Sequence, residues 1–285
     1  MKIRKIVTCE DEFLSCLCDF EDMPARMFVR GDLPKNKRPK VVAIVGSRKN
    51  TKYGESVAYQ LAYELAGCGA VVVSGLAYGI DAAAHRGCMD AGGVTFAVLG
   101  TPIEEIYPKQ NTQLATRILE RGAIISEYDK KSKWGSWSFV RRNRIVSGLA
   151  DAVVIVEAAM RSGSLTTATW ALEQGKELFA VPGDITRPMS VGCNRVIKQG
   201  AHVFTETEDV LGVLWPSNAK QLKFEVFGDD AEEEAVICML KKGVTDGDEI
   251  AEELGWRAKD FSRTISMLEI KGIAKSLGAN TWRLC

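Results

Sequence analysis

Residues 129–144 combine a high density of positive charge with aromatic side chains. The segment holds six basic residues against one acidic residue, and Trp134, Trp137 and Phe139 lie among them. Cations can hold the phosphates of a nucleic-acid strand, and flat rings can stack on its unpaired bases. The segment therefore favours binding of single-stranded nucleic acid. The lysines expected to extend the basic surface are Lys130, Lys131 and Lys133.

Three arginines, Arg141, Arg142 and Arg144, lie within four successive positions just before an apolar run. We expect this stretch to be a helix that leads into a buried strand. Positions one and two apart do not share a helix face, so the three side chains cannot all face one groove. We expect Arg142 and Arg144 to contact nucleic acid and the third arginine to pair locally, with Asp129 or Glu127. The simpler interpretation is that the tryptophans fix a loop to the core and the arginines face water.

Glycine and small polar residues follow most of the predicted strands, at residues 46–48, 74–81, 99–101, 157–168 and 181–184. Several of these loops open into helices, whose N-terminal N–H groups and dipole attract anions. Glycine also serves plain turns, but several such loops at one edge of a sheet favour an anion-binding rim. Arg48 follows one of these strands, so we expect it to hold a phosphate rather than form a surface salt bridge.

The chain lacks the motifs of common nucleotide-binding enzymes. The first loop reads GSRKNTKYG instead of G-x-G-x-x-G, and no G-K-[ST] follows a glycine-rich loop. His85 is expected to cap or pack a helix. Three carboxylates end strands near the rim without a convincing partner or nucleophile, namely Glu127, Glu157 and Asp184. We therefore expect no catalytic residue, no cofactor and no bound metal.

Short apolar runs rich in valine and isoleucine alternate with helical patterns along most of the chain. Continuous apolar runs of this kind are typical of parallel strands covered on both faces. The alternation predicts an α/β fold, a Rossmann-like, doubly wound and mostly parallel sheet. The expected strands are 41–47, 70–75, 94–100, 123–127, 151–158, 177–183 and 201–206, and helices are expected at 53–69 and 164–176.

The pattern divides the chain into four parts. Residues 1–40 are an N-terminal lead-in with a helix and an extended piece, 41–215 the Rossmann-like domain, 216–228 a linker, and 229–285 a small domain. The last part shows three helical patterns and a hairpin that turns at 278–280, which predicts a winged helix.

The net charge of the chain is zero, but the charged residues are unevenly distributed between its two parts. Residues 1–223 hold 29 basic and 24 acidic residues, and residues 224–285 hold 8 and 13. Opposite signs suggest different partners.

The eight cysteines are expected to stay reduced. Cys9, Cys16 and Cys18 contain no C-x-x-C pair, which argues against a zinc site, and Cys68, Cys88 and Cys193 fall in predicted helices or at their ends. No apolar run approaches the ~20 residues of a membrane span, and the N-terminus has no signal-peptide core. We therefore expect a cytoplasmic protein with no membrane contact, where thiols remain reduced.

Taken together and in order, these segments resemble the DNA-processing protein A family (DprA, also called Smf). The resemblance covers roughly residues 25–215. It implies a Rossmann-like domain without catalytic activity that binds single-stranded DNA, protects it on entry, forms a homodimer, and loads the RecA recombinase during natural transformation. Single-strand-binding protein is a further implied partner. The segments that carry the resemblance are GSR (46–48), SGLAYGID (74–81), YPKQN (107–111), ISE (125–127), FVRRNRIVSGLAD (139–151), EAAMRSGSLTTA (157–168), FAVPGD (179–184) and GCNRVIKQGA (192–201).

The resemblance also implies a set of DNA-contacting residues. Alanine at Arg48 or Arg144 is expected to remove most of the affinity for single-stranded DNA and leave the fold intact. The complete set is Gly46, Ser47, Arg48, Lys133, Phe139, Arg142, Asn143, Arg144, Ser162, Gly163, Ser164 and Thr166.

Two other functions stay open. The same rim could serve an enzyme of a related Rossmann-like family that cleaves nucleoside monophosphates, although a mononucleotide does not need the six cations of residues 129–144. The fold could also be kept mainly for protein contacts. The acidic C-terminal domain is expected to bind protein or stabilise a dimer, because its charge would repel a DNA duplex.

Overall fold

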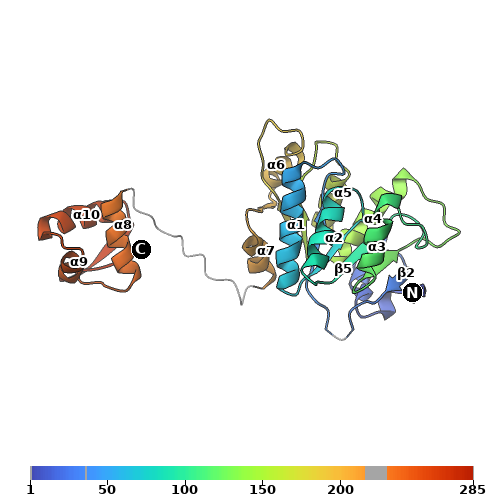
Figure 1. Ribbon diagram of the computed structural model, residues 1–285, viewed down its shortest axis with the longest axis horizontal. Helices are drawn as coiled ribbons and strands as arrows, with labels where there is room; N and C mark the ends of the chain where they lie inside the picture. Colours follow the sequence, from blue (N-terminus) through green and yellow to red (C-terminus); the bar gives the residue numbers. More distant parts are fainter. Residues whose placement is uncertain (1, 36, 216–229, 285) are drawn as a thin grey trace. The chain divides into compact units, whose positions relative to one another are not determined.

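In the computed structural model, which describes residues 2–35, 37–215 and 230–284, one sheet of nine strands organises the larger part of the chain (Figure 1). The strand order is β1-β2-β6-β5-β4-β3-β7-β8-β9. The seven strands from β3 to β9 run parallel to one another, and β2 pairs antiparallel with both β6 and β1. The bounds are β1 Arg4–Val7, β2 Arg26–Gly31, β3 Val41–Val45, β4 Val71–Ser74, β5 Thr95–Leu99, β6 Ala123–Ser126, β7 Ala152–Ile155, β8 Glu177–Ala180 and β9 His202–Val203.

All seven strands expected from the apolar runs are present, which confirms the fold class. In β3 the side chains of Val41, Ala43 and Val45 pack on one face of the sheet, and those of Val42 and Ile44 pack on the other. A strand buried on both faces needs apolar residues at every position, because successive side chains point to opposite sides. The continuous apolar runs in the sequence have this physical origin.

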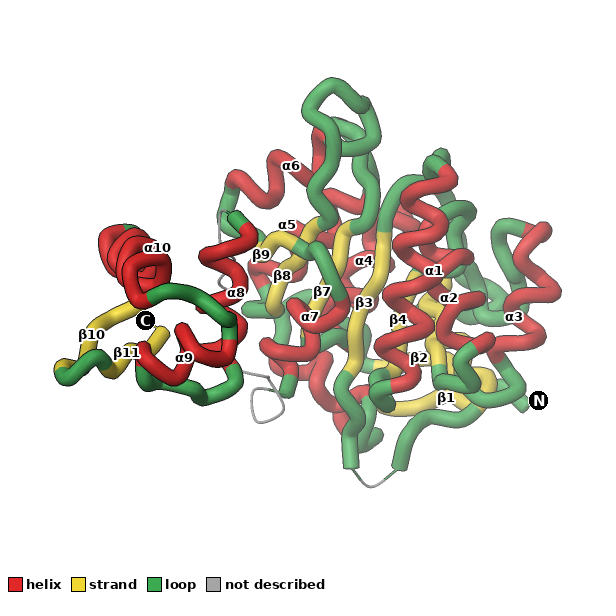
Figure 2. The backbone as a smooth tube through the Cα atoms, turned by 60° about the vertical axis from the view of Figure 1, so that its left-hand side comes forward, coloured by secondary structure: helices red, strands yellow, loops and turns green. Residues whose placement is uncertain are grey.

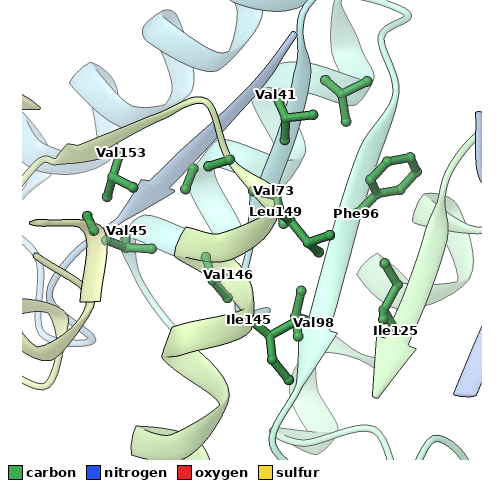
Figure 3. Packing of buried hydrophobic residues seen from close by; sticks show 14 of the residues in the cluster. Val41, Val45, Val73, Phe96, Val98, Ile125, Ile145, Val146, Leu149 and Val153 are labelled. Carbon is green, nitrogen blue, oxygen red and sulfur yellow. The ribbon is translucent and has the colours of Figure 1, made fainter. Parts of the chain in front are cut away.

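Helices cover both faces of the sheet. Figure 2 shows helices on both sides of the sheet. Side chains of α1, α2 and α7 pack with one face, and those of α4, α5 and α6 pack with the other. Figure 3 shows Ile145, Val146 and Leu149 of α4 against the sheet residues Val73 and Val98. The bounds are α1 Lys52–Gly67, α2 Ile80–Asp90, α3 Thr112–Ile118, α4 Ser136–Leu149, α5 Ser164–Glu173, α6 Val191–Lys198 and α7 Thr207–Leu214.

The first 40 residues are not a separate lead-in. Strand β2 pairs with β6 and β1 pairs with β2, so both extend the main sheet. Between them the expected helix is replaced by two short 3-10 helices, Thr8–Glu10 and Leu14–Asp19. Leu17 and Met27 are fully buried in the same core as α4. The segment therefore covers an edge of the sheet and part of its face, and it belongs to the compact unit Met1–Ala219.

The expectation that every cysteine is reduced is wrong in this structure, because Cys9 and Cys18 form a disulfide. The two 3-10 helices fold the segment back on itself and bring the Cα atoms of these residues to 5.9 Å, within the range that a disulfide requires. Cys88 and Cys193 are buried in α2 and α6, as expected, and burial raises the pKa of each thiol to about 12.

The second compact unit, Lys220–Cys285, has a core of its own. Helices α8 (Ala231–Lys241), α9 (Gly247–Glu253) and α10 (Ala258–Ile270) precede a hairpin of β10 (Ala274–Gly278) and β11 (Thr281–Leu284). The hairpin turns at 278–280, where Gly278, Ala279 and Asn280 have positive φ. These elements are the ones expected from the sequence, and the winged-helix assignment itself stays a prediction. The expected linker, 216–228, lies outside the described residues.

Candidate nucleic-acid interface

A cleft of about 760 Å³ opens at the carboxyl end of the parallel strands. The chain leaves β3 through α1 towards β4 on one side, and it enters β7 from α4 on the other side. The order of connections therefore reverses beside β3, and the loops that follow β3 and β7 diverge there. Ligands of open α/β sheets bind at such a point. The loops after β3, β4 and β7, together with α4, line this cleft.

The cleft brings together most of the residues that the sequence predicted for the site. It does not include Lys133, Thr166 or Arg144 among its lining. Lys133 is exposed in the loop before α4, and the Thr166 hydroxyl accepts a hydrogen bond from Asn143 Nδ2 at 2.8 Å. The predicted residues that line the cleft are Gly46, Ser47, Arg48, Phe139, Arg142, Asn143, Ser162, Gly163 and Ser164.

One wall of the cleft is aromatic. The rings of Tyr107, Trp134 and Phe139 lie within 5.3 to 6.0 Å of one another, measured between centroids. Tyr107 is 44% exposed and Trp134 is 37% exposed, so both offer ring surface to a ligand. The Arg48 guanidinium lies over the Phe139 ring at 5.5 Å. Sequence reasoning assigned Tyr107 no role, although it opens the YPKQN segment that supports the family resemblance.

The opposite wall carries hydroxyl groups at the start of α5. Ser162 Oγ and Ser164 Oγ are 2.7 Å apart, and Asn143 Nδ2 donates to the Gly163 carbonyl at 3.1 Å. The N–H groups of Ser164 and Thr166 bond within the loop, to Ser162 Oγ and to the Gly163 carbonyl. Because these two N–H groups are already bonded, an anion at this wall would meet the serine hydroxyls and the positive end of the α5 dipole.

The loop after β3 approaches this wall closely. Ser47 N donates to the Glu157 carbonyl at 2.7 Å, and a side chain at Gly46 would meet Ile80 Cγ1 at 2.7 Å. Both Glu157 carboxylate oxygens accept bonds from Thr51, which fixes the loop where α1 begins. The exposed Arg48 side chain thus extends from a rigid backbone, as a phosphate contact needs.

The floor of the cleft is a buried arginine. Arg142 is 3% exposed, and its Nη1 donates to the carbonyls of Gly75, at 2.5 Å, and Val98. The nearby Asp81 accepts bonds from the N–H groups of Gly75 and Ala77 at 3.1 and 3.3 Å. Burial lowers the pKa of Arg142 to about 10 and raises the pKa of Asp81. Arg142 therefore stays charged at neutral pH, and it places positive potential at the floor of the cleft.

Arg144 does not lie at the cleft. Its side chain is fully buried, with Nη2 2.7 Å from Glu127 Oε2 and Nε 3.4 Å from Asp22 Oδ2. Arg141 also pairs with Asp22, at 3.0 Å. This burial contradicts the expectation that Arg144 contacts DNA. Residues three apart share a helix face, so Arg141 and Arg144 both face the N-terminal segment and only Arg142 faces the cleft.

Similarity to known proteins identifies the family of this chain. Residues 4–214 match the profile of the family described as DNA recombination-mediator protein A. The chain belongs to this family. Among relatives in the DNA recombination-mediator protein A family, Protein Smf of Escherichia coli is 38% identical over 262 residues, which cover 88% of this chain and 69% of that protein. The DNA processing protein DprA of Streptococcus pneumoniae is 43% identical over 199 residues, 68% of each chain.

Two solved structures of the DNA recombination-mediator protein A family have the same architecture. DprA from Streptococcus pneumoniae has a TM-score of 0.69 at 39% identity and covers 74% of each chain. DNA processing protein A from Helicobacter pylori has a TM-score of 0.68 at 29% identity and covers 76% of this chain and 97% of its own. The work on the Helicobacter pylori protein concerns its single-stranded DNA binding mode.

The family description is that of a recombination mediator, in agreement with the prediction that the chain is not an enzyme. Burial lowers the pKa of His85 to about 3, and its Nδ1 lies 2.7 Å from Thr95 Oγ1, so it packs inside the fold. Asp81 is the one carboxylate among the described residues that line the cleft. Over the described ranges, no three metal-ligating side chains lie together, and no helix is long and apolar enough to span a membrane.

Proposed function

We propose that the protein binds single-stranded DNA in this cleft, with bases against the aromatic wall and phosphates towards Arg48 and the serine hydroxyls. The observation that carries the proposal is that exposed aromatic rings, the Arg48 guanidinium and serine hydroxyls all line one cleft. Stacking accepts any base, and phosphate contacts release counterions, so binding is expected to tolerate sequence and weaken with salt. The single-stranded DNA binding mode described for the Helicobacter pylori relative supports this proposal.

The two exposed tryptophans provide a matched test. Trp134 lines the cleft, whereas Trp137 packs edge-on against Tyr128 and does not line it. Trp134→Ala is expected to weaken oligo-dT binding by about 1–3 kcal/mol, the contribution of one stacked base. Trp137→Ala, which removes the same side chain, should change the affinity much less. Fluorescence anisotropy with labelled oligo-dT measures both, and equal losses for the two variants would contradict the cleft as the binding site.

Arg48→Ala tests the phosphate contact. The arginine is exposed and its guanidinium lies over the Phe139 ring, so its removal should leave the thermal unfolding temperature unchanged. We expect weaker oligo-dT binding and a salt slope smaller by about 0.7, the contribution of one phosphate contact to a single strand. An unchanged slope and affinity would argue against phosphate recognition by Arg48.

Beyond the binding step, we propose that the protein protects incoming single-stranded DNA and loads RecA during natural transformation, acting as a homodimer. The family description as a recombination mediator supports this role. The measurement is the rate of RecA assembly on oligo-dT coated with single-strand-binding protein, with and without the full chain. The alternative, cleavage of nucleoside monophosphates, is checked in parallel by incubating the protein with these nucleotides, and we expect no turnover.

A further inference from the structure

A second surface of exposed basic and apolar side chains borders the cleft on the side of the β7–α5 loop. We call it the α6 bank, and it consists of Met160, Arg161, Ile185, Arg187 and Arg195. These residues come from the loop after β7, the loop after β8 and helix α6. None of them lines the cleft. We propose that the α6 bank binds the part of a DNA strand that continues out of the cleft. This inference rests on the proposed function and extends it.

Backbone hydrogen bonds join the α6 bank to the cleft. The N–H of Ala158 donates to the Met189 carbonyl at 2.8 Å, and the N–H of Gly192 donates to the Ala158 carbonyl at 2.8 Å. Ala159 and Met189 line the cleft, and Met160 follows directly in the chain. These bonds hold the α6 bank at the border of the cleft. A DNA strand that leaves the cleft on this side would contact the α6 bank directly.

The charge of the α6 bank suits a phosphate backbone. The segments 158–172 and 185–200 contain no acidic residue, and they supply Arg161, Arg187, Arg195 and Lys198. Among the described residues, no carboxylate lies within ion-pair distance of Arg161 or Arg195, and Arg195 Nη1 lies 3.5 Å from Met160 Sδ. Arg187 has one partner, Asp184 at 3.8 Å, and is largely exposed. Unpaired guanidinium groups near one another favour a polyanion.

Exposed apolar side chains lie among these arginines. Ile185 is 84% exposed and Met160 is 50% exposed, so neither contributes much to the core. A single exposed apolar residue needs no explanation, but two that flank arginines at the border of a nucleic-acid site offer apolar contact to bases and sugars. The cleft itself has the volume of a site for one small ligand, so a longer strand must contact protein outside it.

The test compares two lengths of oligo-dT, because only the longer strand reaches the α6 bank. Oligonucleotides of about 4 and about 16 nucleotides bracket the site sizes of single-strand-binding folds. For the full chain with Arg161→Ala and Arg195→Ala combined, we expect roughly tenfold weaker binding of the longer oligonucleotide and a salt slope smaller by about 1.4, two phosphate contacts. Binding of the shorter oligonucleotide should match that of the unsubstituted protein.

The matched control is Arg121→Ala. Arg121 is also exposed, but it lies just before β6, at the amino end of that strand and away from the cleft at the carboxyl ends, where it donates to the Gly92 carbonyl. If the double variant binds the longer oligonucleotide as tightly as the Arg121→Ala protein and with the same salt slope, the inference is wrong and the cleft proposal stands. Equal losses for both lengths would place the arginines in the cleft and overturn a separate surface. Failure of the unsubstituted protein to bind either length would contradict the proposed function itself.

Discussion

Neighbouring arginines in α4 have different roles because the helix directs each side chain into a different environment. Arg142 is satisfied by backbone carbonyls beneath the cleft, and Arg144 is buried against Glu127 and Asp22. Arg48, on the loop after β3, is the arginine at the cleft whose side chain is exposed. Sequence reasoning treated Arg48 and Arg144 as equivalent DNA contacts, but only Arg48 is exposed at the cleft, whereas Arg144 is buried in an ion pair.

Arg144→Ala is therefore expected to destabilise the fold, unlike Arg48→Ala. Removing the guanidinium leaves the Glu127 carboxylate buried without its close partner, which typically costs 3–5 kcal/mol when one member of a buried pair is lost. Chemical denaturation of both variants measures the free energy of unfolding. The double variant Arg144→Met with Glu127→Gln removes both charges and should recover part of the loss. Equal stability of the Arg144→Ala and unsubstituted proteins would contradict the role assigned to this pair.

At the scale of elements, the sequence predicted the parallel strands well and the N-terminal strands poorly. Val41–Val45 and Ala152–Ile155 are buried on both faces, so their apolar runs are visible without any knowledge of neighbours. Strand β1 reads RKIV with exposed ends, and β2 pairs with β6 about a hundred residues later. Pairing at that separation depends on the finished sheet, which a local pattern cannot contain.

The N-terminal segment should contribute to stability as a core element. Leu17 is fully buried beside α4, and Leu172 of α5 is 59% exposed. Leu17→Ala is expected to lower the free energy of unfolding by about 2–5 kcal/mol, the usual cost of removing a buried leucine side chain. Leu172→Ala removes the same atoms from a surface position and serves as the control in the same urea titration. A loss for Leu17→Ala no larger than for the control would mean that the segment is dispensable.

The same contrast governs the candidate site. The loops at the strand ends were predictable, because an open parallel sheet directs ligands to its carboxyl edge. The loop residues Ser47, Arg48 and Ser164 accordingly line the cleft. Tyr107 could not be assigned from sequence, since its place beside Trp134 depends on how two separate loops pack. The loop motifs therefore predicted where the candidate site lies. Which side chains are accessible in it depends on tertiary packing.

At the scale of the whole chain, charge divides with the two compact units. Residues 1–223 carry an excess of basic residues and residues 224–285 an excess of acidic ones. In the second unit, the first turn of α8 holds the exposed Glu232 and the half-buried Glu234, whereas Glu233 is buried and pairs with Lys271. The C-terminal part of α10 exposes Met267 and Ile270, and Ile270 is 80% exposed. Acidic groups and exposed apolar side chains fit a protein partner better than a phosphate backbone.

The second unit is accordingly expected not to bind duplex DNA. Its buried core supports production of residues 224–285 as a separate fragment, whose helix content circular dichroism can verify. Arg263 of α10, the third helix, which in helix-turn-helix domains often enters the major groove, is already paired with Glu232. We expect no mobility shift of a labelled duplex at physiological salt, since an excess of acidic residues repels the phosphates. A shift produced by the folded fragment, and lost in high salt, would show instead that local charge on α10 outweighs the acidic surface.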